Sequence, residues 1–168
     1  MLPTPQPLPR LFADAMLGGL TRWLRVLDFD VAYDPSIDDP ELVELALAEG
    51  RTILTRDRKL TERRRAQNHL LIASGKVEEQ VRQVLEAFGV RPDPLRLLHR
   101  CLVCNLSMEP IDAARARALV PPFVARTQNE FRICPGCARI YWHGTHAARM
   151  AGKLAQMGLD FSAARAPS

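Results

Sequence analysis

The chain has 168 residues, of which 47% are hydrophobic and 25% charged, and its formal net charge is +4 at pH 7. This composition excludes a disordered or collagen-like chain, and the length predicts one or two domains of ~100–200 residues each. No apolar run approaches the ~18–20 residues of a membrane-spanning helix. The proline-rich residues 1–9 lack the apolar core of a signal peptide. We therefore expect a cytoplasmic protein without a membrane partner, preceded by an extended tail.

The net positive charge of the chain comes entirely from its C-terminal part. Residues 1–100 contain 15 basic and 15 acidic side chains, whereas residues 101–168 contain 8 and 4. Within the first part, seven acidic residues at 28–44 are followed by seven basic residues at 51–65. Adjacent acidic and basic clusters suit a metal-dependent enzyme that acts on a polyanion. The alternative interpretation is two solvated faces of a charged surface.

The hydrophobic pattern of residues 10–90 alternates between short strands and amphipathic helices. Strands are expected at 10–14, 29–33, 51–55 and 69–73, and helices at 16–28, 38–49, 58–67 and 75–88. Gly50 and Gly89 are good helix ends, and Pro40 suits a helix start. Strands separated by helices predict right-handed crossovers and a mostly parallel sheet in a three-layer α/β domain.

Two acidic residues follow strands of this predicted sheet, where sites form in open parallel sheets. Asp14 follows the first strand and Asp57 the third, while Asp38 and Asp39 stand at the entry to the second helix. Converging carboxylates suit Mg²⁺ or Mn²⁺, and such an ion could activate a water for attack on a phosphodiester. The alternative is that each acid only caps a helix.

Basic side chains flank these acids in the sequence and could hold backbone phosphates. We expect the RNA-binding residues to be Arg22, Arg25, Arg56 and Arg58, together with the run at 63–65.

Four segments (12–25, 29–33, 38–43 and 49–58) together resemble the Mut-seven C-terminal RNase family. The resemblance extends over residues 10–150, because that family also carries a C-terminal zinc ribbon. It implies a PIN-like fold and a ribonuclease that acts on RNA. It also implies that Asp14, Asp39 and Asp57 occupy acidic metal-binding positions, with Asp38 as a substitute for Asp39.

One position departs from the pattern of PIN-type sites, which usually have a fourth acid after the fourth strand. Residues 73–75 read Ala-Ser-Gly and offer no carboxylate. Glu78 or Glu79 would have to reach in from the following helix, which leaves a second metal position open.

The four cysteines form two Cys-x-x-Cys pairs, Cys101 with Cys104 and Cys134 with Cys137, separated by 29 residues. Two such pairs make a tetrahedral zinc site, whereas disulfides would require an oxidising compartment. A closed four-cysteine shell leaves no position for substrate, so we assign Zn²⁺ to folding. The gap between the pairs predicts an inserted helix or loop around 111–119.

Other side chains near the cysteines have less specific patterns. His99, His143 and His146 are expected to be ordinary imidazoles rather than zinc ligands. The aromatic pair Tyr141 and Trp142, beside several arginines, could stack bases or only cover the small ribbon core.

These patterns predict a tail at 1–9, a nuclease domain at 10–92, a zinc ribbon at 93–150 and a helix or tail at 151–168. The main functional hypothesis is a Mg²⁺- or Mn²⁺-dependent ribonuclease whose zinc ribbon assists RNA binding. An RNA-binding module without catalysis is the alternative. A phosphoacceptor domain, with Ser74 after the fourth strand, would need a further strand carrying a lysine. A homodimer and an inhibitory protein partner are both compatible with the sequence. The sequence does not identify the RNA substrate or distinguish endonucleolytic from exonucleolytic cleavage.

Overall fold

The structure, a computed structural model, describes residues 7–91 and 93–159 of the chain. The chain divides into two compact units, with the boundary between residues 92 and 93. Most of the tail expected at 1–9, and residues 160–168 of the helix or tail expected at 151–168, lie outside the described residues. Each unit is described by itself below.

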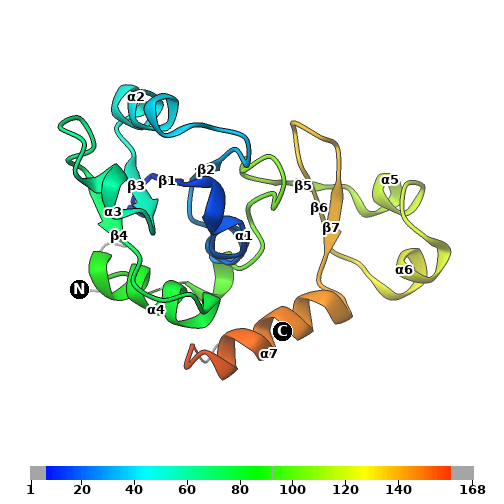
Figure 1. The fold of residues 1–168 in the computed structure, drawn as a ribbon. Helices are drawn as coiled ribbons and strands as arrows, with labels where there is room; N and C mark the ends of the chain where they lie inside the picture. Colours follow the sequence, from blue (N-terminus) through cyan, green and yellow to red (C-terminus); the bar gives the residue numbers. More distant parts are fainter. Residues whose placement is uncertain (1–6, 92, 160–168) are drawn as a thin grey trace, which may run out of the picture. The chain divides into compact units, whose positions relative to one another are not determined.

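The first unit is built on a parallel sheet of four strands in the order β2-β1-β3-β4 (Figure 1). The strands are β1 (Leu11–Ala13), β2 (Val31–Tyr33), β3 (Thr52–Thr55) and β4 (His69–Leu71). Leu11 pairs with Val31 on one side and with Thr52 on the other, so β1 lies between β2 and β3. This confirms the predicted α/β class with a parallel sheet. Within the described part of this unit no fifth strand follows β4, so the strand that a phosphoacceptor domain requires is missing.

Helices cover both faces of this sheet (Figure 1). They are the 3₁₀ turn η1 (Ala15–Leu17), α1 (Gly18–Val26), α2 (Asp39–Glu49), α3 (Arg58–Thr61) and α4 (Val77–Phe88). Phe12 and Ile53 pack against Leu42 of α2 and Leu60 of α3 on one face, whereas α1 and α4 lie side by side on the other. The helices that follow β1 and β3 therefore lie on opposite faces of the sheet. The place where β1 and β3 end side by side is thus the point where the strand order reverses.

The helix ends follow the predicted signals at most positions. The side chain of Asp38 caps α2, and Gly50 and Gly89 end α2 and α4 with φ of 63° and 61°. The first helix, expected at 16–28, begins as the turn η1 and ends at Val26. The largest difference is at α3, which stops at Thr61 rather than near residue 67. Its continuation at 62–65 is Glu-Arg-Arg-Arg, which is exposed and offers no apolar face that the sheet could bury.

The acidic and basic clusters predicted from the sequence pair with each other. Arg51, 8% exposed, binds Asp30 at 2.7 Å and also contacts Glu49. Further along, Arg63 lies 3.6 Å from Asp39, and Arg65 lies 2.9 Å from Glu44. Part of each cluster is therefore neutralised by the other, which neither interpretation of the sequence predicts.

The second unit contains an antiparallel sheet in the order β5-β6-β7. Its strands are β5 (Glu109–Ile111), β6 (Phe131–Ile133) and β7 (Ile140–Trp142). Its helices are the 3₁₀ turn η2 (Pro94–Arg96), α5 (Ala113–Arg117), α6 (Pro122–Thr127) and α7 (Thr145–Gln156). The two short helices α5 and α6 fill the gap between the cysteine pairs, as the spacing predicted. Among the described residues, no helix is long and apolar enough to cross a membrane.

Candidate active site and metal centre

Asp14 lies directly after β1, at the point where the strand order reverses. Its side chain is buried, with 6% of the residue exposed. Oδ1 accepts a hydrogen bond from the Met16 amide at 2.9 Å, which caps η1. Oδ2 accepts from the Arg56 amide at 3.2 Å and from the Thr55 hydroxyl. Three donors, from the end of β3 and from the turns that follow β1 and β3, therefore fix the carboxylate.

The hydroxyl of Thr55 connects the two acids that follow β1 and β3. Thr55 is fully buried, donates to Asp14 and accepts from the Asp57 amide at 3.0 Å. The Asp57 carboxylate in turn accepts from the Lys59 amide at 2.8 Å and caps α3. Asp14 and Asp57 thus cap their helices and belong to one hydrogen-bonded network at the carboxyl edge of the sheet. The capping expected as the alternative is therefore observed for both residues, and it does not prevent them from sharing one hydrogen-bonded network.

Asp38 and Asp39 have partners elsewhere. Asp38 accepts from the Glu41 amide at 2.9 Å, and Asp39 forms its ion pair with Arg63. In the part of the chain that the structure describes, no three carboxylates place their oxygens within 4.8 Å of one another. The structure therefore joins Asp14 and Asp57 but does not gather either helix-entry acid with them.

The loop after β4 binds a glutamate of the following helix, α4. The Ser74 hydroxyl donates to Glu79, and this bond, with Lys76 nearby, holds the pKa of the Glu79 carboxyl below its usual range. A Cβ on Gly75 would meet the guanidinium of Arg56 at 3.6 Å, so the Arg56 side chain lies beside this loop. Glu78 is exposed.

Three of the four predicted RNA-binding arginines are on the surface and one is not. Arg22, Arg56 and Arg58 are exposed. Arg25 is only 5% exposed and donates from Nε and Nη2 to the Val31 carbonyl at 3.1 and 2.8 Å. The buried face of α1 is wider than its apolar residues suggested, because the helix packs against both β2 and α4. Arg25 therefore holds α1 to β2 and is not presented to a ligand.

Thr55 is the residue that sequence reasoning missed as part of this site. The signal was a hydroxyl residue at the end of a buried strand, two positions before Asp57. A buried hydroxyl must find a partner, and here the partner lies on the neighbouring strand.

The second centre is formed by the four cysteines, whose sulfurs all lie within 4.8 Å of one another. The cysteines are not in disulfides, and the Sγ atoms of Cys101 and Cys137 are 3.8 Å apart. No histidine belongs to this group among the side chains described. Four sulfurs at these distances fit a tetrahedral Zn²⁺ ion.

The two cysteine pairs adopt the same backbone conformation. The amide of Cys101 donates to the Leu106 carbonyl at 2.8 Å, and that of Cys134 to the Arg139 carbonyl at 3.0 Å. The residue after each second cysteine bonds back to the first cysteine of its pair and has positive φ, 63° at Asn105 and 58° at Ala138. This repeat turns both pairs toward one point.

The pKa values of two of the clustered thiols are shifted in opposite directions. Burial opposes ionisation of Cys101, but bonds from the Cys104 amide and the Tyr141 hydroxyl outweigh it and lower the pKa of Cys101 to about 6. A hydrogen bond with Cys137 raises the pKa of Cys104 to about 12. Since zinc binds thiolates, loading the site releases the remaining protons. The hydroxyl of Tyr141 lies 3.3 Å from Cys101 Sγ, and its ring packs against the small core around the cysteines. Tyr141 therefore covers this core.

Comparison with known sequences gives one family. The sequence model described as Mut7-C RNAse domain matches residues 9–154, which confirms the resemblance seen in the sequence. No curated protein and no solved structure shows a significant match to the chain.

Proposed function

The chain belongs to the Mut7-C RNAse domain family, and from this premise we propose that it is a metal-dependent ribonuclease with a PIN-like active site. The observation that carries the proposal is the network of Asp14, Thr55 and Asp57 at the point where the strand order reverses. Open parallel sheets bind their ligands at this point. A buried carboxylate there, held by three donors, is an anchor for a cation or for a reacting group.

The donors at this edge fit Mg²⁺ or Mn²⁺ in kind. Carboxylate oxygens are hard ligands, and Mg²⁺ is often held by one or two of them with waters completing its shell. Each ionised carboxylate offers about four lone-pair sites. The hydrogen bonds described above use three of these sites on Asp14 and one on Asp57, so both carboxylates keep sites for a cation. Asp14 and Asp57 would therefore hold the ion, with Asp39 or Asp38 joining if α2 shifted toward the sheet.

A bound divalent ion would supply Lewis-acid polarisation and a water of lowered pKa. The chain itself orients the carboxylates, because Thr55 and the amides of Met16, Arg56 and Lys59 fix the oxygens of Asp14 and Asp57. The exposed side chains of Arg56 and Arg58, on either side of Asp57, would bind the phosphates that flank the scissile bond.

The zinc ribbon would assist by binding the RNA strand. We assign its Zn²⁺ to folding, because four cysteines leave no open position. The excess of basic side chains at 101–168, 8 against 4, supplies the long-range attraction for a polyanion. A cytoplasmic location, a homodimer and an inhibitory partner remain predictions from the sequence.

The test compares Asp57→Asn with Asp112→Asn on end-labelled single-stranded RNA. Both aspartates cap helices, Asp112 through the Arg115 amide at 3.0 Å in the second unit, and asparagine caps as well as aspartate does. We expect cleavage to require added Mn²⁺ or Mg²⁺, to be lost in Asp57→Asn and to persist in Asp112→Asn. Equal cleavage by the two variants, or cleavage without added metal, would refute the assignment.

A second candidate is an RNA-binding module without catalysis. It is favoured because, among the described residues, no three carboxylates place their oxygens within 4.8 Å of one another. Binding of RNA by the wild-type protein, with no cleavage under either metal, would support this candidate.

A further inference from the structure

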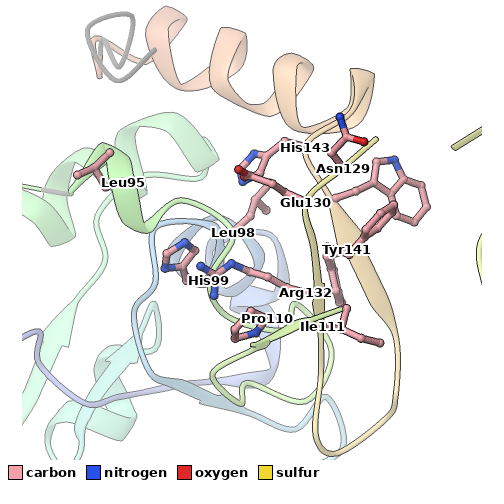
Figure 2. Close-up of a pocket in the computed structure, with 12 residues that line it drawn as sticks. Leu95, Leu98, His99, Pro110, Ile111, Asn129, Glu130, Arg132, Tyr141 and His143 are labelled. Carbon is pink, nitrogen blue, oxygen red and sulfur yellow. The ribbon is translucent and has the colours of Figure 1, made fainter. Parts of the chain in front are cut away.

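The second unit contains a cavity of about 550 Å³ at the end of its sheet where β6 begins and β7 ends (Figure 2). Its walls come from the ends of all three strands and from the segment 95–99 that precedes the first cysteine pair. The volume lies within the ~300–1,000 Å³ of small-ligand sites. Because none of the acids assigned to the nuclease site lines it, the cavity would bind a ligand by different chemistry.

Aromatic side chains form one wall of the cavity. Phe131 and Trp142 are directly paired across β6 and β7 and therefore lie on the same face of the sheet. Phe131 is 4% exposed, whereas Trp142 is half-buried, so the indole is the ring that a ligand can reach. Tyr141 and Arg132 are paired at the next position, so they lie on the opposite face of the sheet, where the Tyr141 hydroxyl is bound to Cys101. Residues from both faces therefore line the cavity.

A cation and several hydrogen-bonding groups complete the lining. Arg132 donates from Nη1 to the Met108 carbonyl at 3.4 Å, and Figure 2 shows its side chain reaching toward His99. A guanidinium has five N–H donors, so this one bond leaves donors for a phosphate. Toward the other end lie Asn129, Glu130 and His143, which are exposed (Figure 2). Amide, carboxylate and imidazole groups are those that bind the edge of a base.

We propose that this cavity binds one unpaired nucleotide of an RNA strand, with the base stacked on Trp142 and a phosphate on Arg132. An aromatic ring and a cation within one site are the combination by which proteins hold single-stranded nucleic acid, and residues Trp142 and Arg132 both line this cavity. The surplus of basic residues at 101–168 favours a polyanion over an apolar peptide. The choice of RNA rests on the proposed function, but binding here does not require the nuclease site to be active.

The experiment uses the full chain loaded with zinc and carrying two substitutions. Asp57→Asn prevents cleavage, and Trp23→Phe leaves Trp142 as the single tryptophan, since the sequence contains only these two. The protein is titrated with oligo(U), oligo(A), AMP and inorganic phosphate while the Trp142 emission is recorded. We expect saturable quenching by the oligonucleotides and by AMP. A response to phosphate equal to that of AMP would indicate an anion site without base stacking and overturn the proposal.

Matched substitutions test the two contacts by fluorescence anisotropy of labelled oligo(U). Arg132→Ala and Arg126→Ala each remove one charge from the second unit, but Arg126 lies on the exposed surface of α6, away from the cavity lining. We expect Arg132→Ala to weaken binding at least about fivefold more than Arg126→Ala. Trp142→Ala should also weaken it by about fivefold or more, and Trp142→Phe should restore most of the affinity. Zinc content is measured for every variant, so that loss of folding is recognised.

The outcomes separate this inference from the proposed function. Equal affinities for Arg132→Ala and Arg126→Ala, or an unchanged Trp142 emission at saturating RNA, would overturn the cavity as a nucleotide site even if the wild-type protein cleaves RNA. Quenching of Trp142 without cleavage by the wild-type protein would support the cavity and refute the nuclease.

Discussion

The buried hydroxyl of Thr55 gives the sharpest test of how the proposed site is built. Thr55→Val keeps the shape of the side chain but removes its bond to the Asp14 carboxylate and its acceptance of the Asp57 amide. A hydrogen bond to a charged group contributes about 1.5–3 kcal/mol, and a buried amide left without a partner costs about 1–3 kcal/mol. Because Asp57 is partly exposed, water compensates part of the second cost. We expect the free energy of unfolding to fall by about 2–4 kcal/mol.

Two control substitutions isolate the hydroxyl. Thr55→Ser retains it and should cost about 0.5–1.5 kcal/mol, as other losses of one buried methyl do. Thr52→Val makes the same change on the same strand, where the hydroxyl bonds to Asn68 in an exposed position, and should change stability by less than about 0.5 kcal/mol.

Urea unfolding is followed through the emission of Trp23 in a Trp142→Phe background, so that the signal reports the first unit. RNA cleavage is measured in parallel under native conditions. We expect Thr55→Val to lose most activity while Thr55→Ser keeps it, because the carboxylate of Asp14 is oriented by the hydroxyl. Equal stabilities of Thr55→Val and Thr52→Val would refute the network as a structural element, and full activity of Thr55→Val would refute its role in the site.

Three further predictions concern other parts of the chain. Cys134→Ser should release zinc and unfold the second unit while the first unit keeps its unfolding transition, as measured by metal content and by the separate emissions of Trp23 and Trp142. Gly50→Ala and Gly89→Ala should each lower the free energy of unfolding by about 1 kcal/mol. Both glycines have positive φ, and an added Cβ would meet nothing within 4 Å, so a much larger loss in urea unfolding would contradict this explanation. Ala138→Gly should leave stability unchanged or raise it by up to about 1 kcal/mol, because Ala138 has a φ of 58° that glycine adopts without cost; a clear loss in thermal unfolding would argue against strain there.

The sequence determined the features that are encoded within a few consecutive residues. The alternation of strands and helices, the ends of α2 and α4 at Gly50 and Gly89, and the two cysteine pairs all follow from local patterns. The periodicity also placed Asp14 and Asp57 after the first and third strands, and parallel strands end at a common edge of their sheet. Each of these depends on backbone geometry or on ligand spacing, and both are set by neighbouring residues.

Only the tertiary structure decided which distant side chains meet. It buried Arg25, which the sequence assigned to RNA, and paired the two charged clusters through Arg63 and Asp39. It also placed the Thr55 hydroxyl between two acids and assembled a cavity from the ends of three strands. The burial of a side chain depends on the width of the face that neighbouring elements cover, and a hydrogen bond between strands depends on their order in the sheet. Both quantities are set by packing between segments far apart in the chain, so no local pattern carries them.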